Sequence, residues 1–346
     1  MERKKKLIGL NLQQLREVAA QTGLPPFAAK QMARWIYDKR VTDINSMTDL
    51  SKTGRERLAS QYCIGRSEPK LCSRSTDGTA KYLFDGRGGR DIEAVMIPDN
   101  DRATICVSSQ AGCKMNCSFC MTGRQGFHGN LDTADIINQI LSIDESESLT
   151  NIVFMGMGEP LDNIDAVLAA IDIITAPWGL AWSPKRITVS SVGLLRNMRR
   201  LLEETKVHIA ISVHSPYPAE RASIMPVEKA WSITKVMDML RDYDFAHQRR
   251  LSVEYIMFRG LNDDVRHADA LARLVKGTSA RVNLIRYHAI DADDKRQPAT
   301  QADMEAFRDR LNEKGITATI RASRGQDIDA ACGMLAGKQN EQTKHL

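Results

Sequence analysis

Long apolar runs are missing from this sequence of 346 residues. No stretch reaches the roughly eighteen apolar residues that a membrane-spanning helix needs, so we expect no association with a membrane. The start, MERKKKLIGLNLQQL, has a basic run followed by two short apolar clusters broken by Asn and Gln, and so lacks the apolar core of a signal peptide. These absences predict a soluble globular protein.

Cysteine is scarce as well, and its distribution is uneven. The chain has seven cysteines, and three of them, Cys113, Cys117 and Cys120, fall within GCKMNCSFCMTG. An odd number with this clustering is typical of metal ligation in a reducing compartment rather than of a disulfide framework. We therefore expect a cytoplasmic protein.

Positive charge is concentrated at the start of the chain. Residues 1–75 hold fifteen Lys and Arg against seven Asp and Glu, whereas the whole chain has a formal net charge of +5. The remainder is therefore slightly acidic. A basic module on a near-neutral body indicates a polyanion partner, most plausibly nucleic acid, although a solvated basic face would look the same.

The first hundred residues divide into two segments. Helical signals run through 11–60, where LQQLREVAAQTG ends at a glycine and two prolines follow. We expect a small helical domain over 1–75. In TAKYLFDGRGGRDIEAVMIP, apolar and polar residues alternate around a glycine-rich turn, which predicts a β-hairpin linker within 76–102.

A repeating pattern of strands and helices follows. The runs TICVSS, NIVFMG, RITVSS, VHIAISV, LSVEYIMF and RVNLIRY are rich in β-branched residues, and each precedes a stretch long enough for a helix. Six such units predict an α/β fold with a parallel sheet covered by helices. A doubly wound sheet would also fit, but no glycine-rich dinucleotide turn follows the first strand. We favour a partial (β/α)6 barrel over 103–325, with ITATIRAS as a possible last strand and a tail over 326–346.

The candidate functional residues follow the predicted strands. In parallel α/β folds, ligands bind at the loops beyond the carboxyl ends of the strands. The residues expected on this rim are the three clustered cysteines, Gly156, Gly158, Glu159, Ser190, Ser191, Ser212, His214 and His288.

The spacing of the clustered cysteines suits an iron-sulfur cluster. Thiolates separated by three and two residues can each bond a different iron of a [4Fe-4S] cube, and only three are supplied. One iron would then be open to a further ligand, as metal catalysis requires. The alternative is a Cys3His zinc site with His128, but the gap from Cys120 to His128 is long for a zinc loop.

The cysteine loop resembles the signature of the radical SAM superfamily, C-x-x-x-C-x-x-C with an aromatic residue, here Phe119. The strings CVSSQAGCKMNCSFCMTGRQGF, FMGMGEPLDN and DIDAACGMLAG are similar to the RlmN/Cfr family of radical SAM RNA adenosine methyltransferases. PFAAKQMARWIYDKRVTDINSMTDLSK resembles that family's amino-terminal accessory domain. The resemblance covers essentially the whole chain.

The resemblance implies two cofactors and a set of residues that bind them. The open iron would be chelated by S-adenosylmethionine (SAM), which is split to a 5′-deoxyadenosyl radical. Gly158 and Glu159 would hold the methionine amino group. The other positions that match cofactor contacts are Ser190, Ser212, Val213, His214 and His288. Many members have Asn at position 288, so this sequence departs from the family pattern there.

The resemblance also assigns roles to three isolated residues. Cys332 would be methylated by one SAM and would carry the methyl group to RNA. Cys106 would attack the resulting protein–RNA thioether and form a disulfide with Cys332, and Glu93 would remove the proton from the adenine carbon. Cys63 and Cys72 match none of these roles and are interpreted as structural.

The chemistry accounts for this apparatus. Carbon 2 of adenine is electrophilic and has no acidic proton, so polar methyl transfer fails there, whereas a carbon radical can add. The base must also be extruded from folded RNA, and the basic domain could grip the phosphates. The resemblance thus implies methylation of carbon 2 of an adenosine in the peptidyl transferase loop of 23S rRNA, and of the adenosine beside the anticodon in tRNAs. A flavodoxin-like protein would donate electrons, and we expect a monomer.

Three alternatives remain open from the sequence. A Cfr-type enzyme would methylate carbon 8 of the same rRNA adenosine and confer antibiotic resistance. A zinc-dependent RNA-binding protein would use the cysteine loop and the basic domain without catalysis. A radical SAM enzyme acting on a metabolite or a protein is disfavoured by Cys332, because a carrier thiol is specific to this methyl transfer.

Overall fold

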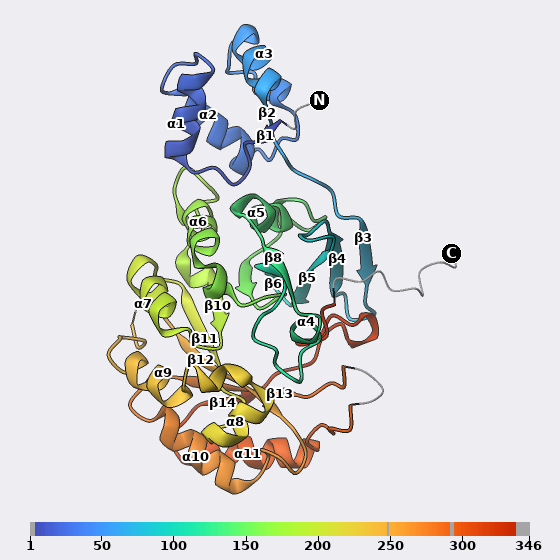
Figure 1. Cartoon of the computed structure of the whole chain (residues 1–346), viewed down its shortest axis with the longest axis vertical. Helices are drawn as coiled ribbons and strands as arrows, with labels where there is room; N and C mark the ends of the chain where they lie inside the picture. The colour runs from blue at the N-terminus through green and yellow to red at the C-terminus, as the bar shows by residue number, and fades with distance from the viewer. Residues whose placement is uncertain (1–3, 248, 291–293, 337–346) are drawn as a thin grey trace, which may run out of the picture.

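The computed structural model describes residues 4–247, 249–290 and 294–336. The amino-terminal part is a small helical unit at one end of the molecule (Figure 1). It contains β1 (Lys5–Lys6), α1 (Leu12–Gln21), α2 (Ala28–Ala33), the π-helical turn η1 (Arg34–Asp38), the 3-10 turn η2 (Ile44–Ser46), α3 (Lys52–Gln61) and β2 (Tyr62–Cys63), and β1 pairs with β2. Asn11 begins α1 with a capping box, and its side chain accepts a hydrogen bond from the backbone N–H of Gln14.

An antiparallel extension joins this unit to the barrel. β3 (Leu71–Arg74), β4 (Ala80–Phe84), β5 (Ile92–Asp99) and β6 (Arg102–Cys106) pair in sequence order. The expected hairpin is therefore present as β4 and β5, but a third strand, β3, precedes it. That strand lies within 1–75, the range expected to be helical. Its residues, LCSR, are only partly buried or exposed, so the sequence shows no alternation of apolar and polar residues that would predict a strand there.

The main sheet continues from β6 with parallel strands. These are β9 (Asn151–Phe154), β10 (Ile187–Ser191), β11 (His208–Ser212), β12 (Leu251–Met257), β13 (Arg281–Arg286) and β14 (Ala318–Ile320). The full order is β14-β13-β12-β11-β10-β9-β6-β5-β4-β3, so β14 and β3 form its two edges. All six predicted strands are confirmed, and ITATIRAS supplies β14.

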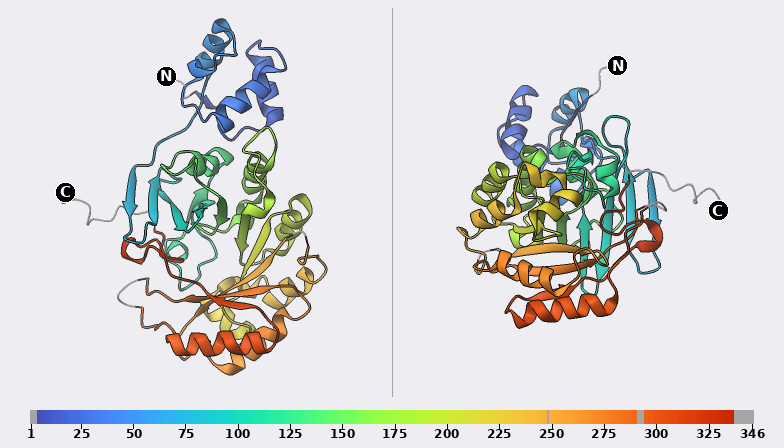
Figure 2. Two further views of the ribbon diagram at one scale, coloured as in Figure 1. Left: turned by 180° about the vertical axis from the view of Figure 1, so that it is seen from behind. Right: turned by 60° about the horizontal axis from the view of Figure 1, so that its bottom comes forward.

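The parallel strands form a curved sheet, and the helices cover its outer face (Figures 1 and 2). The long helices are α5 (Thr133–Leu141), α6 (Ile164–Thr175), α7 (Leu195–Glu204), α9 (Ile233–Leu240), α10 (Val265–Val275) and α11 (Gln301–Glu313). The shorter elements are β7 (Gln110–Gly112), α4 (Met121–Arg124), β8 (Phe127–Asn130), η3 (Pro160–Asn163), η4 (Pro184–Arg186), α8 (Pro218–Ile224), η5 (Pro226–Lys229) and η6 (Gln326–Ile328).

The core lies between the sheet and these helices. Ile152, Val189 and Ile209 are fully buried in neighbouring strands, and Val167 and Ile174 face them from α6. Each buried aliphatic side chain of this size contributes roughly 1.5–3 kcal/mol of burial free energy. The packing fixes the strand ends, and these in turn fix the loops that carry the candidate site. Within the described residues, no helix is long and apolar enough to cross a membrane.

Candidate active site

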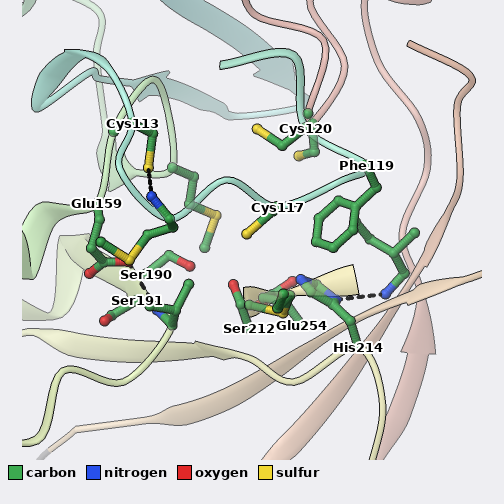
Figure 3. A pocket seen from close by; sticks show the side chains of 18 of the residues that line it. Cys113, Cys117, Phe119, Cys120, Glu159, Ser190, Ser191, Ser212, His214 and Glu254 are labelled. Atoms are coloured by element: carbon green, nitrogen blue, oxygen red, sulfur yellow. Dashed lines mark hydrogen bonds between the residues drawn. The ribbon is translucent and has the colours of Figure 1, made fainter. Parts of the chain in front are cut away.

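A pocket at the carboxyl ends of the strands brings together most of the residues singled out from the sequence. Its walls come from the cysteine loop, from the segments after β9, β10 and β11, from β12, and from the segment after β14. The predicted residues that line it are Cys113, Cys117, Cys120, Gly156, Gly158, Glu159, Ser190, Ser191, Ser212, His214 and Cys332. Figure 3 shows the three clustered cysteines in the upper part of the view, Glu159 beside Cys113, and the labelled serines, Glu254 and His214 below them.

The cysteine loop is held by tight backbone turns. Gly112 has a φ of +73°, and a Cβ there would lie 1.8 Å from the Gly126 carbonyl oxygen. The Met115 N–H points at the Cys113 Sγ at 3.5 Å, and the Cys120 N–H donates to the Cys117 carbonyl at 3.1 Å. Burial raises the pKa of the Cys113 thiol to about 12 and also raises those of the other two thiols, because a thiolate is poorly solvated there.

This donor set fits an iron-sulfur cluster better than a single ion. Two thiolates on one Zn²⁺ would lie about 4 Å apart, since each Zn–S bond is about 2.3 Å. Among the described residues, no three His, Cys, Asp or Glu side chains are gathered closely enough to ligate one ion. In a [4Fe-4S] cube each thiolate bonds a different iron, so the thiols stand farther apart around a common space. His128, the fourth ligand of the zinc alternative, is not among the residues that line the pocket, and its Nε2 contacts the Gln125 carbonyl at 3.0 Å.

Glu159 provides a buried carboxylate beside the cysteines. Its Oε1 accepts from the Leu161 N–H and its Oε2 from the Val192 N–H, both at 3.0 Å. Burial raises the pKa of this carboxyl to about 7, although these hydrogen bonds oppose the shift. Gly158 has a φ of +99°, and a Cβ there would lie 2.5 Å from the Gln110 side chain. The loop can therefore place Glu159 only because residue 158 is glycine.

His214 supplies a donor of defined tautomer. Its Nδ1 accepts from the Ile256 N–H at 3.0 Å, so the ring proton of the neutral form lies on Nε2. Burial lowers the pKa of His214 to about 3, and the Arg221 guanidinium adds to this shift. The ring meets Phe119 edge-on, with centroids 4.9 Å apart. His214 thus offers an N–H donor and no charge at neutral pH.

Arg221 stabilises the backbone segments that form the rim of the pocket. It is fully buried, and its guanidinium donates to the carbonyls of Val192, Ser212 and Val213 at 3.0–3.1 Å. It also forms an ion pair with the buried Glu228. These contacts join the ends of β10 and β11 to α8 and hold the Ser212–His214 segment in place.

Hydrogen-bond acceptors and hydroxyls line the remaining wall. Ser190 and Ser212 contribute hydroxyl groups from the ends of β10 and β11. Glu254 on β12 is buried, and its Oε1 accepts from Ser252 and Asn283. In the part of the chain that the structure describes, Glu254 Oε2 accepts no hydrogen bond and lies 3.6 Å from the Arg321 guanidinium. This acceptor is suited to a ligand that carries hydroxyl or amino groups, as SAM does.

Two further thiols, Cys332 and Cys106, lie near the cysteine loop and the end of β6, respectively. The Cys332 side chain is exposed to the pocket, next to Arg321. Protein walls around the thiol raise the pKa of Cys332, and the Arg321 guanidinium partly offsets the rise. Cys106 is buried at the end of β6, and burial, together with the neighbouring Cys332, raises its pKa to about 12. Both thiols are free and lie within electrostatic range of each other.

Four predicted residues do not line the pocket. Val213 is fully buried and contributes its backbone, and Cys106 lies behind the wall. Glu93 is buried in β5 and contacts the carboxy-terminal segment. His288 differs from the expectation, because its Nε2 contacts the Ser323 hydroxyl at 2.8 Å and it lines a neighbouring cavity on the far side of Cys332. Cys63 and Cys72 lie in β2 and β3, away from the pocket.

Sequence reasoning missed Arg221, Glu254 and Arg321. An arginine in PAERASI reads as a surface residue, and nothing in its neighbours signals burial. Glu254 interrupts the apolar strand LSVEYIMF, and a charged residue in a buried strand is a usable signal of a site. Arg321 directly follows the last strand, at the same rim as the other candidates.

Two family models match the chain. One, described as the radical SAM superfamily, matches residues 107–272; the other, described as the ribosomal RNA large subunit methyltransferase N-terminal domain, matches residues 5–64. A curated protein of Parabacteroides distasonis, a probable dual-specificity RNA methyltransferase RlmN, is 55% identical over 97% of this chain and 98% of its own length. The dual-specificity RNA methyltransferase RlmN of Alkalilimnicola ehrlichii is 40% identical over 98% and 95%, respectively.

A solved structure supports the same assignment. The crystal structure of a radical SAM methyltransferase from Sphaerobacter thermophilus is similar with a TM-score of 0.90 and 35% identity, over 96% of this chain and 100% of that chain. This similarity confirms the predicted α/β fold with a partial barrel. Both matched family models and the full-length relatives agree with the resemblance seen in the cysteine loop and its companion motifs. The chain belongs to the RlmN family of radical SAM RNA methyltransferases.

Proposed function

We propose that this protein methylates carbon 2 of an adenosine in the peptidyl transferase loop of 23S rRNA, and of the adenosine beside the anticodon in tRNAs, through a methylated Cys332. The observation that carries the proposal is the position of Cys332, whose side chain is exposed to the same pocket as the three clustered cysteines. A carrier thiol must meet both the methyl donor and the substrate, and this location allows it to do so.

The pocket residues divide the binding of two cofactors between them. Cys113, Cys117 and Cys120 ligate a [4Fe-4S] cluster, and SAM is bound across the remaining walls. When bound, the cluster and SAM supply the one-electron chemistry that an unreactive adenine carbon requires. The Glu159 carboxylate accepts from the methionine ammonium of SAM, which favours the charged form of Glu159 despite its burial.

Hydroxyl and imidazole groups orient the rest of SAM. Ser190 and Ser212 offer hydroxyls, and the Val213–His214 segment is held rigid by Arg221. His214 would donate from Nε2 and would bring no positive charge to a pocket that holds a cationic ligand. Glu254 Oε2 offers an acceptor to the ribose hydroxyls. His288 lines the neighbouring cavity rather than this pocket, so we assign it no contact with SAM.

Three residues of the chain carry the methyl transfer. The Cys332 sulfur accepts a methyl group. After that methyl group has lost one hydrogen atom to the radical that SAM would supply, its carbon bonds to carbon 2 of the adenine. Glu93 takes the proton from carbon 2, and the unpaired electron left on the ring passes to a one-electron carrier, so that the ring becomes aromatic again. The Cys106 sulfur then attacks the Cys332 sulfur; an S–S bond forms, and the S–C bond breaks with its electron pair moving to the methylene carbon, which is protonated to the product methyl. A thiol reductant restores both cysteines.

The basic segment 1–75 serves as the RNA-binding part of the enzyme. A groove between its helices and the loop 177–181 supports this role, because it presents Arg16, Lys30, Arg34 and Arg40 against the single acidic residue Asp38. Such a surplus of positive charge attracts backbone phosphates irrespective of sequence. The enzyme acts in the cytoplasm as a monomer, with a flavodoxin-like protein as its electron donor.

Transfer of labelled methyl groups tests the proposal. The reconstituted protein is incubated with methyl-labelled SAM, a low-potential reductant and unmodified 23S rRNA or tRNA. The wild type should label both Cys332 and the RNA. Cys332→Ala should retain its iron and sulfide and leave the RNA unlabelled, whereas Cys63→Ala, which alters a cysteine outside the pocket, should behave as the wild type. Labelled RNA from Cys332→Ala would refute the carrier role.

A further inference from the structure

A buried ion pair lies beneath the segment that carries Cys332. Lys81 on β4 and Glu93 on β5 approach to 3.5 Å between Nζ and Oε1, with side chains only 7% and 2% exposed. Leu83 is paired with Glu93 and Lys81 with Val95, so the lysine and the glutamate are diagonal neighbours on one face of the extension. Burying two charges is costly in free energy, so such a pair is weak evidence for a stabilising role and invites a functional one.

Both members of the pair contact the carboxy-terminal segment. Lys81 Nζ donates to the Asp329 carbonyl at 3.4 Å, and the Ala336 N–H donates to Glu93 Oε2 at 2.9 Å. Asp329 and Ala336 lie on either side of Cys332 in the chain. The ion pair therefore holds the two ends of the short loop that presents the thiol.

The opposite side of this loop is attached to the cysteine loop. The Met121 N–H donates to the Gly333 carbonyl at 2.7 Å, and the Thr122 hydroxyl donates to the Leu335 carbonyl at 2.7 Å. In Figure 1 the segment after β14 runs between α4 and the β3–β5 extension, in agreement with these contacts. Residues 329–336 thus bridge the metal-binding loop and the Lys81–Glu93 pair.

We propose that Lys81 is a positioning residue for methyl transfer, because its ammonium binds both the Glu93 carboxylate and the loop that carries Cys332 and so fixes their relative positions. The proposal rests on the proposed function, in which Glu93 removes the adenine proton and Cys332 carries the carbon. Lys81 forms an ion pair with Glu93, the candidate base, and a hydrogen bond with the Asp329 carbonyl of the loop that carries Cys332. Its role differs from that of the candidate base, since the Lys81 ammonium holds the Glu93 carboxylate in place and takes no proton from the substrate.

The contacts also explain why the lysine matters during turnover. The Ala336 N–H donates to Glu93 Oε2, so the Cys332 loop contacts the oxygen of Glu93 that is not paired with Lys81. When the loop shifts, Lys81 still pairs with Oε1 and keeps the carboxylate in place. Without Lys81, the carboxylate loses this ion pair and the loop loses the hydrogen bond at the Asp329 carbonyl, so proton removal slows while the earlier steps proceed.

Two kinds of measurement test this inference on Lys81→Met. The first follows the covalent protein–RNA adduct on denaturing gels. We expect Cys332 to be methylated normally, and the adduct to be resolved at least about tenfold more slowly, a part of the contribution that a positioned general base makes. The second uses the protein without cofactors or RNA: amide hydrogen exchange in residues 329–336 should be faster than in the wild type.

Matched variants separate charge from packing. Lys81→Arg keeps the positive charge and should restore adduct resolution toward the wild-type rate. Lys81→Gln keeps a hydrogen-bond donor but lacks the charge. If Lys81→Met fails to fold, Lys81→Gln replaces it in both measurements, and we expect the same slow resolution of the adduct. Lys70→Met removes a lysine next to the same extension that pairs with Asp85 and Asp91 and not with Glu93, and should leave both measurements unchanged.

The outcomes distinguish this inference from the proposed function. If the wild type transfers no methyl to RNA, the proposed function fails. If the wild type is active and folded Lys81→Met resolves the adduct at the wild-type rate, the inference on Lys81 is overturned. It is equally overturned if Lys81→Arg is as defective as Lys81→Met, because packing rather than charge would then be responsible.

Discussion

Replacing Arg221 with methionine tests how the rim of the cofactor pocket is held. The guanidinium donates to the carbonyls of Val192, Ser212 and Val213 and is paired with Glu228, all away from solvent. Methionine fills a similar volume but leaves Glu228 as an uncompensated buried charge. Breaking a buried pair in this way costs about 3–5 kcal/mol, so we expect the free energy of unfolding to fall by about that amount.

The rim should also lose its affinity for SAM. Val192 both accepts from Arg221 and donates to Glu159, so a shift of this residue disturbs the carboxylate that faces the ammonium. Urea unfolding of the metal-free protein measures the first effect, and equilibrium binding of SAM to the reconstituted protein measures the second. We expect both to change together.

Two further variants make the reasoning refutable. Arg221→Met combined with Glu228→Gln removes the stranded charge and should recover part of the lost stability, but not the affinity for SAM. Arg200→Met removes an exposed arginine that pairs with Asp165 and Glu204, and it should change neither quantity appreciably. A stability loss in Arg221→Met no larger than that in Arg200→Met would show that the buried network does not hold the rim.

Further predictions concern the loops around the pocket. Gly158→Ala should weaken SAM binding while the fold persists, because a Cβ at a φ of +99° meets the Gln110 side chain at 2.5 Å; titration with SAM checks this, and unchanged affinity would contradict it. His214 has a pKa lowered to about 3, so between pH 6.5 and 3 the unfolded chain binds a proton that the folded chain does not. The free energy of unfolding should therefore fall as the pH drops through this range. The fall should be less steep in His214→Asn, because this variant lacks the titrating imidazole. Asparagine suits the position because it tolerates the positive φ of 57°. Equal slopes in urea titrations of the metal-free proteins would argue against a buried neutral His214.

The strands and the cysteine loop could be predicted because their signals are local. Runs of β-branched residues indicate the strands, and the spacing of the three cysteines indicates that their thiolates can ligate one cluster. Glu159 could be placed because it lies in the loop after the second parallel strand, at the end of the sheet where such folds bind ligands. Each of these conclusions needs only a few consecutive residues.

Residues whose roles depend on distant partners could not be found in this way. Arg221 is buried by segments that precede it by up to 29 positions, and its own helix looks like a surface helix. Lys81 lies where an alternating strand would place a solvated side chain, but the carboxy-terminal segment covers it from 248 positions away. His288 follows a strand end as expected, yet its contact with Ser323 keeps it in the adjacent cavity.

Identification of the methylated nucleoside decides whether the enzyme modifies carbon 2 of adenosine. Unmodified 23S rRNA is incubated with the reconstituted protein, a reductant and methyl-labelled SAM, and the RNA is then digested and its nucleosides are separated and identified by mass spectrometry. We expect a single labelled product, adenosine methylated at carbon 2. A carbon-8 methyl group as the only product, or RNA without label beside active controls, would contradict it.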